Sequence, residues 1–254
     1  MEIKNGDMEE NKPRYMKAYQ AWSIIFFIDP LALPLAPVLA RLKVNPNAIT
    51  VIALIVGLLS GVLFAMGYWF WAPIAFLFSH FLDCIDGKVA RLRQITSEFG
   101  AKLDDIADGL RKPSCFAGVF IYFCVNHHEI FALWTVIVFI VHFFTHKLYQ
   151  LFGVLHSDLE FPDFHRKVIR RFAPRVLALY TFFEEFFFMF FVFPLVAYFV
   201  GMPQGAVFFL WGALFVSALT FLKLLILLNH RRKNRYEQVR QDWRGTKGNL
   251  DKTT

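Results

Sequence analysis

The stretch DCIDGKVARLRQITSEFGAKLDDIAD, residues 83–108, places five aspartates between two strongly apolar segments. The aspartates are Asp83, Asp86, Asp104, Asp105 and Asp108. The apolar segments, at about 70–85 and 113–125, are each too short to cross a bilayer, because a spanning helix needs about 20 apolar residues. They reach that length only if each helix extends into the polar stretch and includes the neighbouring aspartates. We therefore expect a helical hairpin that turns around residues 92–99 and carries its carboxylates near the turn.

The composition of the whole chain is that of a membrane protein. Of its 254 residues, 57% are hydrophobic and 32 are Phe, and the mean hydropathy is +0.45. Soluble domains contain roughly 45–50% apolar residues. Apolar windows recur at about 48–67, 70–85, 113–125, 129–146, 176–200 and 205–228. We therefore predict an all-α integral membrane protein with about six transmembrane helices.

The chain is expected to form one membrane domain with polar ends. Residues 1–30 form a cytosolic N-terminus with an amphipathic surface helix over 13–28, which ends at Asp29-Pro30. Residues 31–229 form the six-span domain, and residues 230–254 form a basic cytosolic tail. No signal peptide is visible in the polar first 20 residues.

The distribution of Lys and Arg predicts the orientation in the membrane. The short connections at 67–71, 126–129 and 201–205 contain neither residue, whereas the termini and the other connections hold nearly all 27. By the positive-inside rule both termini are cytosolic. The net charge of +7 is then explained by a basic cytosolic face that contacts anionic lipid headgroups, and a nucleic acid partner is not needed to explain it. We expect a multi-pass protein of a bacterial-type cytoplasmic membrane.

The spacing of the aspartates predicts paired carboxylates on facing helices. Asp83 and Asp86 are spaced i, i+3, and Asp104 and Asp108 are spaced i, i+4, so each pair shares one helix face. Asp105 is rotated by about 100° from Asp104 and should point elsewhere. Clustered carboxylates near a membrane need a counter-charge, and an oxygen-only donor set favours Mg²⁺ or Mn²⁺ over zinc. Because Mg²⁺ retains open positions for phosphate oxygens, the implied ligand is a phosphate or diphosphate.

Each member of this segment also has a plain structural explanation. Aspartates at an interfacial helix end often form only a solvated face. Gly87 and Gly100 would let a nucleotide approach the backbone, but glycines also pack helices closely. Arg91 could grip a diphosphate through its planar fork, or it could extend to the membrane interface. Two carboxylate pairs with glycines and an arginine between them favour the functional interpretation.

At these residues the chain resembles the CDP-alcohol phosphatidyltransferases. The family signature D-x-x-D-G-x-x-A-R, eight residues, G-x-x-x-D-x-x-x-D is matched at Asp83, Asp86, Gly87, Ala90, Arg91, Gly100, Asp104 and Asp108 without departure. The upstream P-N-x-x-T at Pro46, Asn47 and Thr50 is also similar to the family's approach to its first span. The resemblance covers most of the chain and is weakest before residue 30 and after residue 228.

The resemblance implies a transferase that works on a CDP-linked donor. The donor would be CDP-diacylglycerol or another CDP-alcohol; an acceptor hydroxyl attacks the β-phosphorus, and CMP leaves. The family assigns Asp83, Asp86, Asp104 and Asp108 to one or two metal ions and makes Asp108 the general base as well. Its donor pocket maps to Asn47, Thr50, Gly87, Ala90, Arg91 and Gly100. We expect Asp108 to be the least engaged carboxylate, and the family commonly forms homodimers.

Two rival functions use the same carboxylates. Residues 104–108 also spell D-D-x-x-D, a motif of enzymes that bind prenyl diphosphates. Intramembrane prenyltransferases, however, have more spans and keep their two motifs far apart. A cation transporter is the second rival, but transport sites tend to lie at the bilayer midplane, and transport leaves Gly87 and Arg91 unexplained.

The acceptor is less well defined by the sequence. One hypothesis is a pocket for a phosphorylated acceptor alcohol, formed by Lys147, Arg170, Arg171 and Arg175; the alternative is that these are positive-inside residues in contact with anionic lipid. Glu184 and Glu185 could bind a cationic alcohol or pair with Arg111 or Lys112. His142 and His146 are spaced for a metal pair, although ordinary hydrogen-bonded histidines are the expected interpretation.

Overall fold

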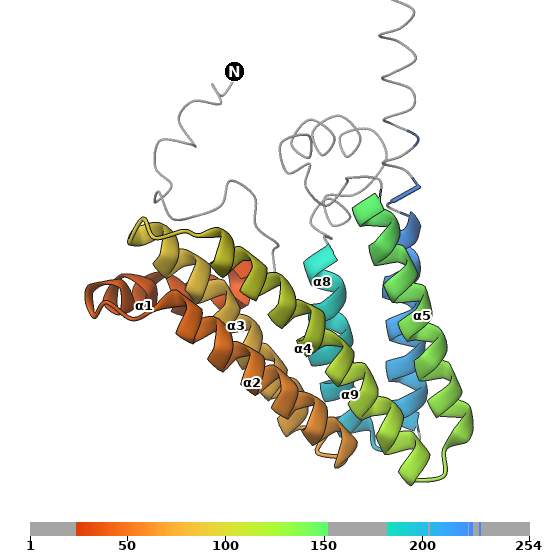
Figure 1. The fold of residues 1–254 in the computed structure, drawn as a ribbon. Helices are drawn as coiled ribbons and strands as arrows, with labels where there is room; N and C mark the ends of the chain where they lie inside the picture. The colour runs from red at the N-terminus through yellow and green to blue at the C-terminus, as the bar shows by residue number, and fades with distance from the viewer. Residues whose placement is uncertain (1–23, 152–181, 203, 223, 226–228, 230–254) are drawn as a thin grey trace, which may run out of the picture.

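A computed structural model describes residues 24–151, 182–202, 204–222, 224–225 and 229, and these residues form helices joined by short turns (Figure 1). The first half contains η1 (Ile24–Ile28), α1 (Asp29–Arg41), α2 (Pro46–Ala65), α3 (Trp71–Leu92) and α4 (Glu98–Val125). The second half contains α5 (Glu129–Leu151), α8 (Phe182–Phe187), η2 (Phe188–Val192), α9 (Phe193–Val200) and the helix Gln204–Leu222. No strand occurs in these ranges, so the all-α prediction is confirmed for the described part of the chain.

Three helices are long and apolar enough to cross a membrane. They are Pro46–Ala65, Glu129–Leu148 and Gln204–Leu222, when only the described residues are considered. Helices α3 and α4 have 22 and 28 residues, which is ample length. Both contain several charged residues in their polar halves, which lowers their hydropathy below that of a simple span.

The aspartate segment forms the predicted hairpin. Helix α3 ends at Leu92 and α4 begins at Glu98, so the turn occupies residues 93–97. Ser97 ends the turn, because its side chain accepts a hydrogen bond from the Gly100 N–H at 3.0 Å. Helix α2 packs against both α3 and α4, and α1 lies near the end where the hairpin turns (Figure 1).

Helix α2 is capped by Asn45, whose side chain accepts a hydrogen bond from the Asn47 N–H at 3.0 Å. Pro46 then occupies the first helical position, where its missing N–H is not needed. Thr50 lies inside α2 and remains available to contact another helix.

The N-terminal helix does not end at Asp29-Pro30. Helical structure runs without a break from Ile24 through Arg41, with Pro34 and Pro37 inside α1. Pro30 is tolerated because it lies in the first turn of α1, where no backbone donor is required. The expected surface helix over 13–28 lies mostly outside the described residues.

The helices pack around an aromatic core at the end of the bundle away from the hairpin turn. Phe64, Trp69, Phe116, Phe123 and Phe190 are buried there among small residues. Gly61 and Gly118 let α2 and α4 approach closely, because a side chain on Gly118 would collide with the Gly61 carbonyl oxygen. This tight α2–α3–α4 unit holds the polar ends of the three helices in a fixed relation.

Candidate metal and diphosphate site

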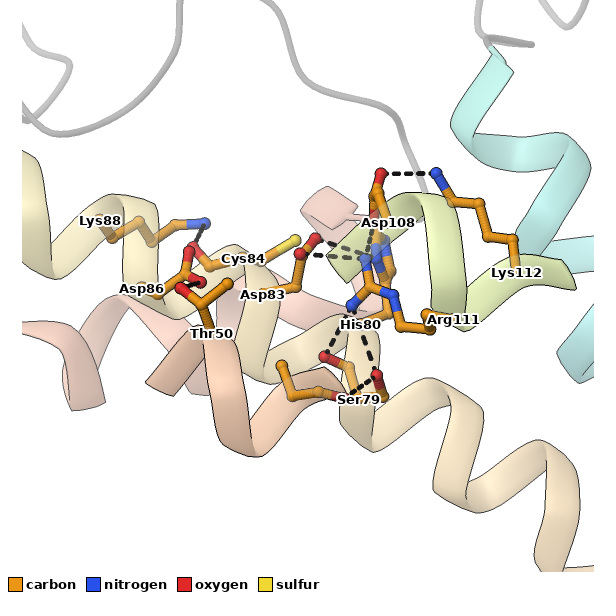
Figure 2. Close-up of polar contacts among 11 residues, drawn as sticks. Thr50, Ser79, His80, Asp83, Cys84, Asp86, Lys88, Asp108, Arg111 and Lys112 are labelled. Carbon is orange, nitrogen blue, oxygen red and sulfur yellow. Dashed lines mark hydrogen bonds and ion pairs between the residues drawn. The ribbon is translucent and has the colours of Figure 1, made fainter. Parts of the chain in front are cut away.

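Three aspartates from the two hairpin helices converge at the polar end of the bundle. Asp83 and Asp86 on α3 and Asp104 on α4 each offer a carboxylate oxygen, and these atoms lie within 4.8 Å of one another. Asp86 is buried and accepts a hydrogen bond from the Thr50 hydroxyl at 2.5 Å (Figure 2). The donor set is oxygen-only and hard, which fits a divalent cation such as Mg²⁺ or Mn²⁺.

Asp108 has different neighbours. Its Oδ1 contacts the Arg111 guanidinium, and its Oδ2 lies 2.5 Å from the Lys112 Nζ. The expectation that Asp108 would be the least engaged carboxylate is therefore wrong, because two cations on its own helix reach it from positions i+3 and i+4. About a third of its side chain (32%) remains exposed. Asp105 is exposed and does not belong to the carboxylate cluster, as its position on the helix predicts.

A pocket of about 310 Å³ lies beside the carboxylate cluster. Its lining includes all six residues predicted to bind the CDP donor, namely Asn47, Thr50, Gly87, Ala90, Arg91 and Gly100. Asp86 and Asp104 line the same pocket and so connect it to the cluster. Its volume is at the lower end of the range of about 300–1,000 Å³ that small-molecule sites occupy.

Glycines keep two walls of this pocket open. A Cβ atom on Gly87 would lie 3.2 Å from the Arg91 Nη1, and one on Gly100 would lie 3.1 Å from the Asn47 Oδ1. Both distances are tighter than ordinary van der Waals contact, so a side chain would push a pocket residue aside. The two glycines therefore preserve the positions of the polar side chains that line the pocket.

Two residues near the carboxylates were not predicted as site residues. His80 places its Nδ1 3.7 Å from Asp83 Oδ2, and the Arg111 Nη2 lies 3.0 Å from Asp83 Oδ1 while contacting Asp108 (Figure 2). The signal was present in the spacing: His80 precedes Asp83 by three residues, and Arg111 follows Asp108 by three. His80, Asp83 and Cys84 also offer ligand atoms within 4.8 Å of one another.

Glu185 does not pair with Arg111 or Lys112, which corrects the proposed ion pair for this residue. It is fully buried; its Oε1 accepts a hydrogen bond from the Ser217 hydroxyl at 2.8 Å and lies 2.8 Å from the His142 Nδ1. Arg111 is instead held by Asp83 and Asp108, whose carboxylates are on the two hairpin helices. His142 is thus a buried, hydrogen-bonded histidine, as expected. The side chain of Glu184 lies outside the described residues.

The predicted acceptor residues are covered only in part. Lys147 lies on α5 with an exposed side chain, and its Nζ is 5.5 Å from the centre of the Phe143 ring. Arg170, Arg171 and Arg175 lie outside the described residues. A phosphate-binding pocket made by these four residues stays a prediction.

The match to known proteins covers the site and most of the bundle. Residues 43–219 match the family model for CDP-alcohol phosphatidyltransferase, which is more than half of the chain. The chain belongs to the CDP-alcohol phosphatidyltransferase family. The intact signature of this family lies on α3 and α4, where the carboxylates converge. The family and the apolar helices together identify it as a membrane protein.

Individual relatives are similar over shorter stretches. The phosphatidylinositol phosphate synthase of Corynebacterium glutamicum is 37% identical over 90 residues, which is 34% of this chain and 40% of that protein. The match thus spans about two fifths of that relative. A crystal structure of Mycobacterium tuberculosis phosphatidylinositol phosphate synthase with manganese and citrate has a TM-score of 0.56 at 20% identity, covering 77% of this chain and 87% of the other. The same protein with CDP-DAG bound has a TM-score of 0.54 at 18% identity, with 79% and 92% covered.

Proposed function

We propose that this protein transfers a phosphatidyl or phospho-alcohol group from a CDP-linked donor to an acceptor hydroxyl and releases CMP. The observation that carries the proposal is the junction between the carboxylate cluster and the pocket, which share Asp86 and Asp104. A diphosphate that lies across this junction would contact a divalent ion held by the carboxylate cluster and the polar side chains that line the pocket. Family membership and the CDP-DAG bound by the M. tuberculosis structure support CDP-diacylglycerol or another CDP-alcohol as the donor.

The proposed division of labour follows the geometry of the side chains. Asp83, Asp86 and Asp104 would hold a divalent ion, with Asp108 as a further ligand in the family assignment. We propose Mg²⁺ or Mn²⁺; when bound, such an ion offsets the negative charge that develops on the phosphoryl oxygens. Thr50 fixes the orientation of Asp86 through its 2.5 Å hydrogen bond.

The remaining pocket residues position the donor. Gly87, Ala90 and Gly100 leave space at the pocket wall, and Asn47 supplies a polar side chain there. Arg91, with its planar guanidinium, would grip the diphosphate. Asp108 would accept the proton of the acceptor hydroxyl as it attacks the β-phosphorus, and its exposed third leaves room for that contact.

The architecture around the site completes the proposal. We propose six spans with both termini cytosolic, a membrane domain over 31–229 preceded by a cytosolic N-terminus over 1–30 and followed by a basic tail over 230–254, in a bacterial-type cytoplasmic membrane. A homodimer is the proposed assembly. For the acceptor we propose a phosphorylated alcohol that is bound with help from Lys147, Arg170, Arg171 and Arg175. The two relatives named above support this choice, because each is named for a product, phosphatidylinositol phosphate, that contains an additional phosphate group.

One assay tests the reaction. Purified protein in detergent is supplied with Mg²⁺, CDP-diacylglycerol and a panel of acceptors that includes inositol phosphate, glycerol 3-phosphate, inositol and ethanolamine, and CMP release is measured. A prenyl diphosphate replaces the CDP-lipid in a parallel reaction. CMP release that needs an acceptor, stops with EDTA and returns with Mg²⁺ or Mn²⁺ supports the proposal. Turnover in metal-free buffer, or reaction only with the prenyl donor, contradicts it.

A further inference from the structure

Arg93 connects the two turns at the polar end of the bundle. It is the residue directly after α3, and its Nη1 donates a hydrogen bond to the Val44 carbonyl oxygen at 2.7 Å. Val44 belongs to the turn between α1 and α2, and the two residues are 49 positions apart in the chain. The α1–α2 turn (residues 42–45) and the α3–α4 turn (residues 93–97) lie at the same end of the bundle (Figure 1). One side chain therefore joins two turns that are distant in sequence.

Each of the two turns is fixed to the helix that precedes it by the same backbone arrangement, a Schellman motif. After α1, Lys43 has a positive φ of 56°, and the Val44 N–H donates a hydrogen bond back to a carbonyl oxygen of α1 at 3.1 Å. After α3, Gln94 has the same φ of 56°, and the Ile95 N–H donates back to a carbonyl oxygen of α3 at 3.0 Å. Because each turn is held by its own helix, the contact of Arg93 with Val44 fixes the two turns relative to each other.

Both turns contribute to the wall of the pocket of about 310 Å³. Asn45 comes from the α1–α2 turn, and residues 95–97 come from the α3–α4 turn. Val44, which accepts the hydrogen bond from Arg93, directly precedes Asn45, and the Asn45 side chain caps α2. In the described part of the chain Arg93 itself is not among the residues that line this pocket. Arg93 therefore holds the pocket wall from behind.

The two walls that Arg93 joins approach each other closely inside the pocket. A Cβ atom on Gly100 of α4 would lie only 3.1 Å from the Asn47 Oδ1 of α2. Asn47 follows the α1–α2 turn in the first turn of α2, and Gly100 follows the α3–α4 turn in the first turn of α4. A small shift of one turn against the other therefore changes the width of the pocket at Asn47.

We propose that Arg93 is a positioning residue for the donor: it fixes the α1–α2 turn against the α3–α4 turn, and so sets the width of the pocket and its affinity for a cytidine diphosphate group. This role rests on the proposed function, which places that group in the pocket. Arg93 acts through Val44 and needs no contact with the donor itself. Loss of the hydrogen bond should therefore weaken donor binding and leave the chemical step unchanged.

Binding of CDP alone tests this role without turnover. The full chain in detergent with Mg²⁺ is titrated with CDP and followed by isothermal titration calorimetry. Arg93→Gln is expected to raise the dissociation constant about tenfold, which is the effect of losing one hydrogen bond from a charged donor. Arg93→Lys keeps the charge on a side chain without the planar fork and should show an intermediate affinity. Arg41→Gln is the matched control: Arg41 is an exposed cation at the end of α1, and this variant should bind CDP like the wild type.

Two further measurements distinguish a positioning role from a purely structural one. Hydrogen–deuterium exchange followed by mass spectrometry should be faster in both turns of Arg93→Gln and unchanged in Arg41→Gln, because the lost hydrogen bond lets the turns open locally. In the CMP-release assay, Arg93→Gln should raise the KM for CDP-diacylglycerol about tenfold and leave kcat and the acceptor KM unchanged, as expected when only binding is weakened.

The outcomes separate the role of Arg93 from the proposed function. Faster exchange with wild-type affinity for CDP would make the hydrogen bond purely structural and overturn the positioning role. Equal losses in Arg93→Gln and Arg41→Gln would also overturn it, because the charge alone would explain them. If Arg93→Gln fails to fold, Arg93→Lys decides, and wild-type affinity in that variant contradicts the role. If the wild type binds CDP but releases no CMP from any donor, the transferase function is refuted while the CDP affinities still decide the role of Arg93.

Discussion

Asp108 and Asp105 belong to the same aspartate-rich part of α4 but have different surroundings. Asp108 is ion-paired beside the site, whereas Asp105 is exposed and outside the carboxylate cluster. We predict that Asp108→Asn lowers turnover by at least about 10²-fold, because a general base contributes about 10²–10⁴-fold, while CDP-lipid binding is retained. Asp105→Asn is the matched control and should keep most of its activity. If the two changes inactivate the protein equally in the CMP-release assay, the conclusion that Asp108 faces the site and Asp105 does not is wrong.

Gly57 gives a way to move Arg111. A Cβ atom at this position would lie 2.6 Å from the Arg111 Cδ and 2.9 Å from the Ser79 Oγ. We predict that Gly57→Ala displaces the guanidinium, reduces CMP release and lowers the stability by about 1–3 kcal/mol, as overpacking usually does. Thermal unfolding followed by tryptophan fluorescence measures the loss.

Gly109→Ala is the control for Gly57→Ala. Nothing lies within 4 Å of the position that its Cβ would take, and Gly109 is in the interior of α4. Alanine favours a helix over glycine by about 0.5–1 kcal/mol, so the melting temperature should stay the same or rise. If Gly57→Ala behaves like Gly109→Ala in both assays, the close fit of Arg111 against α2 is not important.

Among the helices, α1 and α3 are joined by a buried ion pair. The Lys88 Nζ lies 3.0 Å from Asp29 Oδ1, and both side chains are almost completely buried. Lys88 follows Gly87 of the pocket directly, so this pair connects α1 to the pocket wall. A buried pair is costly to break, since the partner that is left becomes an isolated charge.

We predict that Asp29→Asn or Lys88→Met alone lowers the stability by about 3–5 kcal/mol, the usual cost of breaking a buried pair. The double variant Asp29→Leu/Lys88→Met should recover most of that loss, because no charge is left without a partner. The apparent melting temperature of the purified protein measures all three. Losses that simply add in the double variant would show that the two side chains do not interact.

The helix ends of the whole molecule fall into two groups. Helix α4 begins beside the α3–α4 turn and ends at the α4–α5 turn, so Glu98 and Glu129 mark opposite ends of the bundle (Figure 1). Both are exposed first residues of a helix. The basic residues flank the former turn and are absent from the latter. By the positive-inside rule this distribution favours the proposed cytosolic position of the α3–α4 turn.

We predict that Glu129→Cys reacts with a membrane-impermeant maleimide added to intact cells, and that Glu98→Cys reacts only after the cells are opened. The three native cysteines, Cys84, Cys115 and Cys124, are first replaced by alanine. The two positions are a matched pair, because they differ in the side of the membrane and not in local structure. The reverse labelling pattern would invert the proposed topology and move the CDP pocket to the outer face.

The sequence by itself determined the hairpin and the family. The hairpin follows from local rules, since apolar runs specify helices and spacings of three and four residues specify a shared face. The family follows from the signature, and the resemblance assigned six residues to a donor pocket. All six predicted donor residues line one pocket because they occupy consecutive turns of α2, α3 and α4 near their polar ends. The exclusion of Asp105 from the carboxylate cluster has the same origin, since 100° of rotation is a property of one helix.

Only the tertiary structure decided which charges meet. The ion pair of Arg111 with Asp83 depends on how closely α2 packs against α3 and α4, because Gly57 on α2 leaves the space that the Arg111 side chain fills beside Ser79 of α3. The contact of His142 and Ser217 with Glu185 likewise joins three helices that are far apart in sequence. A long charged side chain can reach several partners, and sequence spacing cannot choose among partners on other helices. Packing chooses, because it fixes which of them lies within hydrogen-bonding distance.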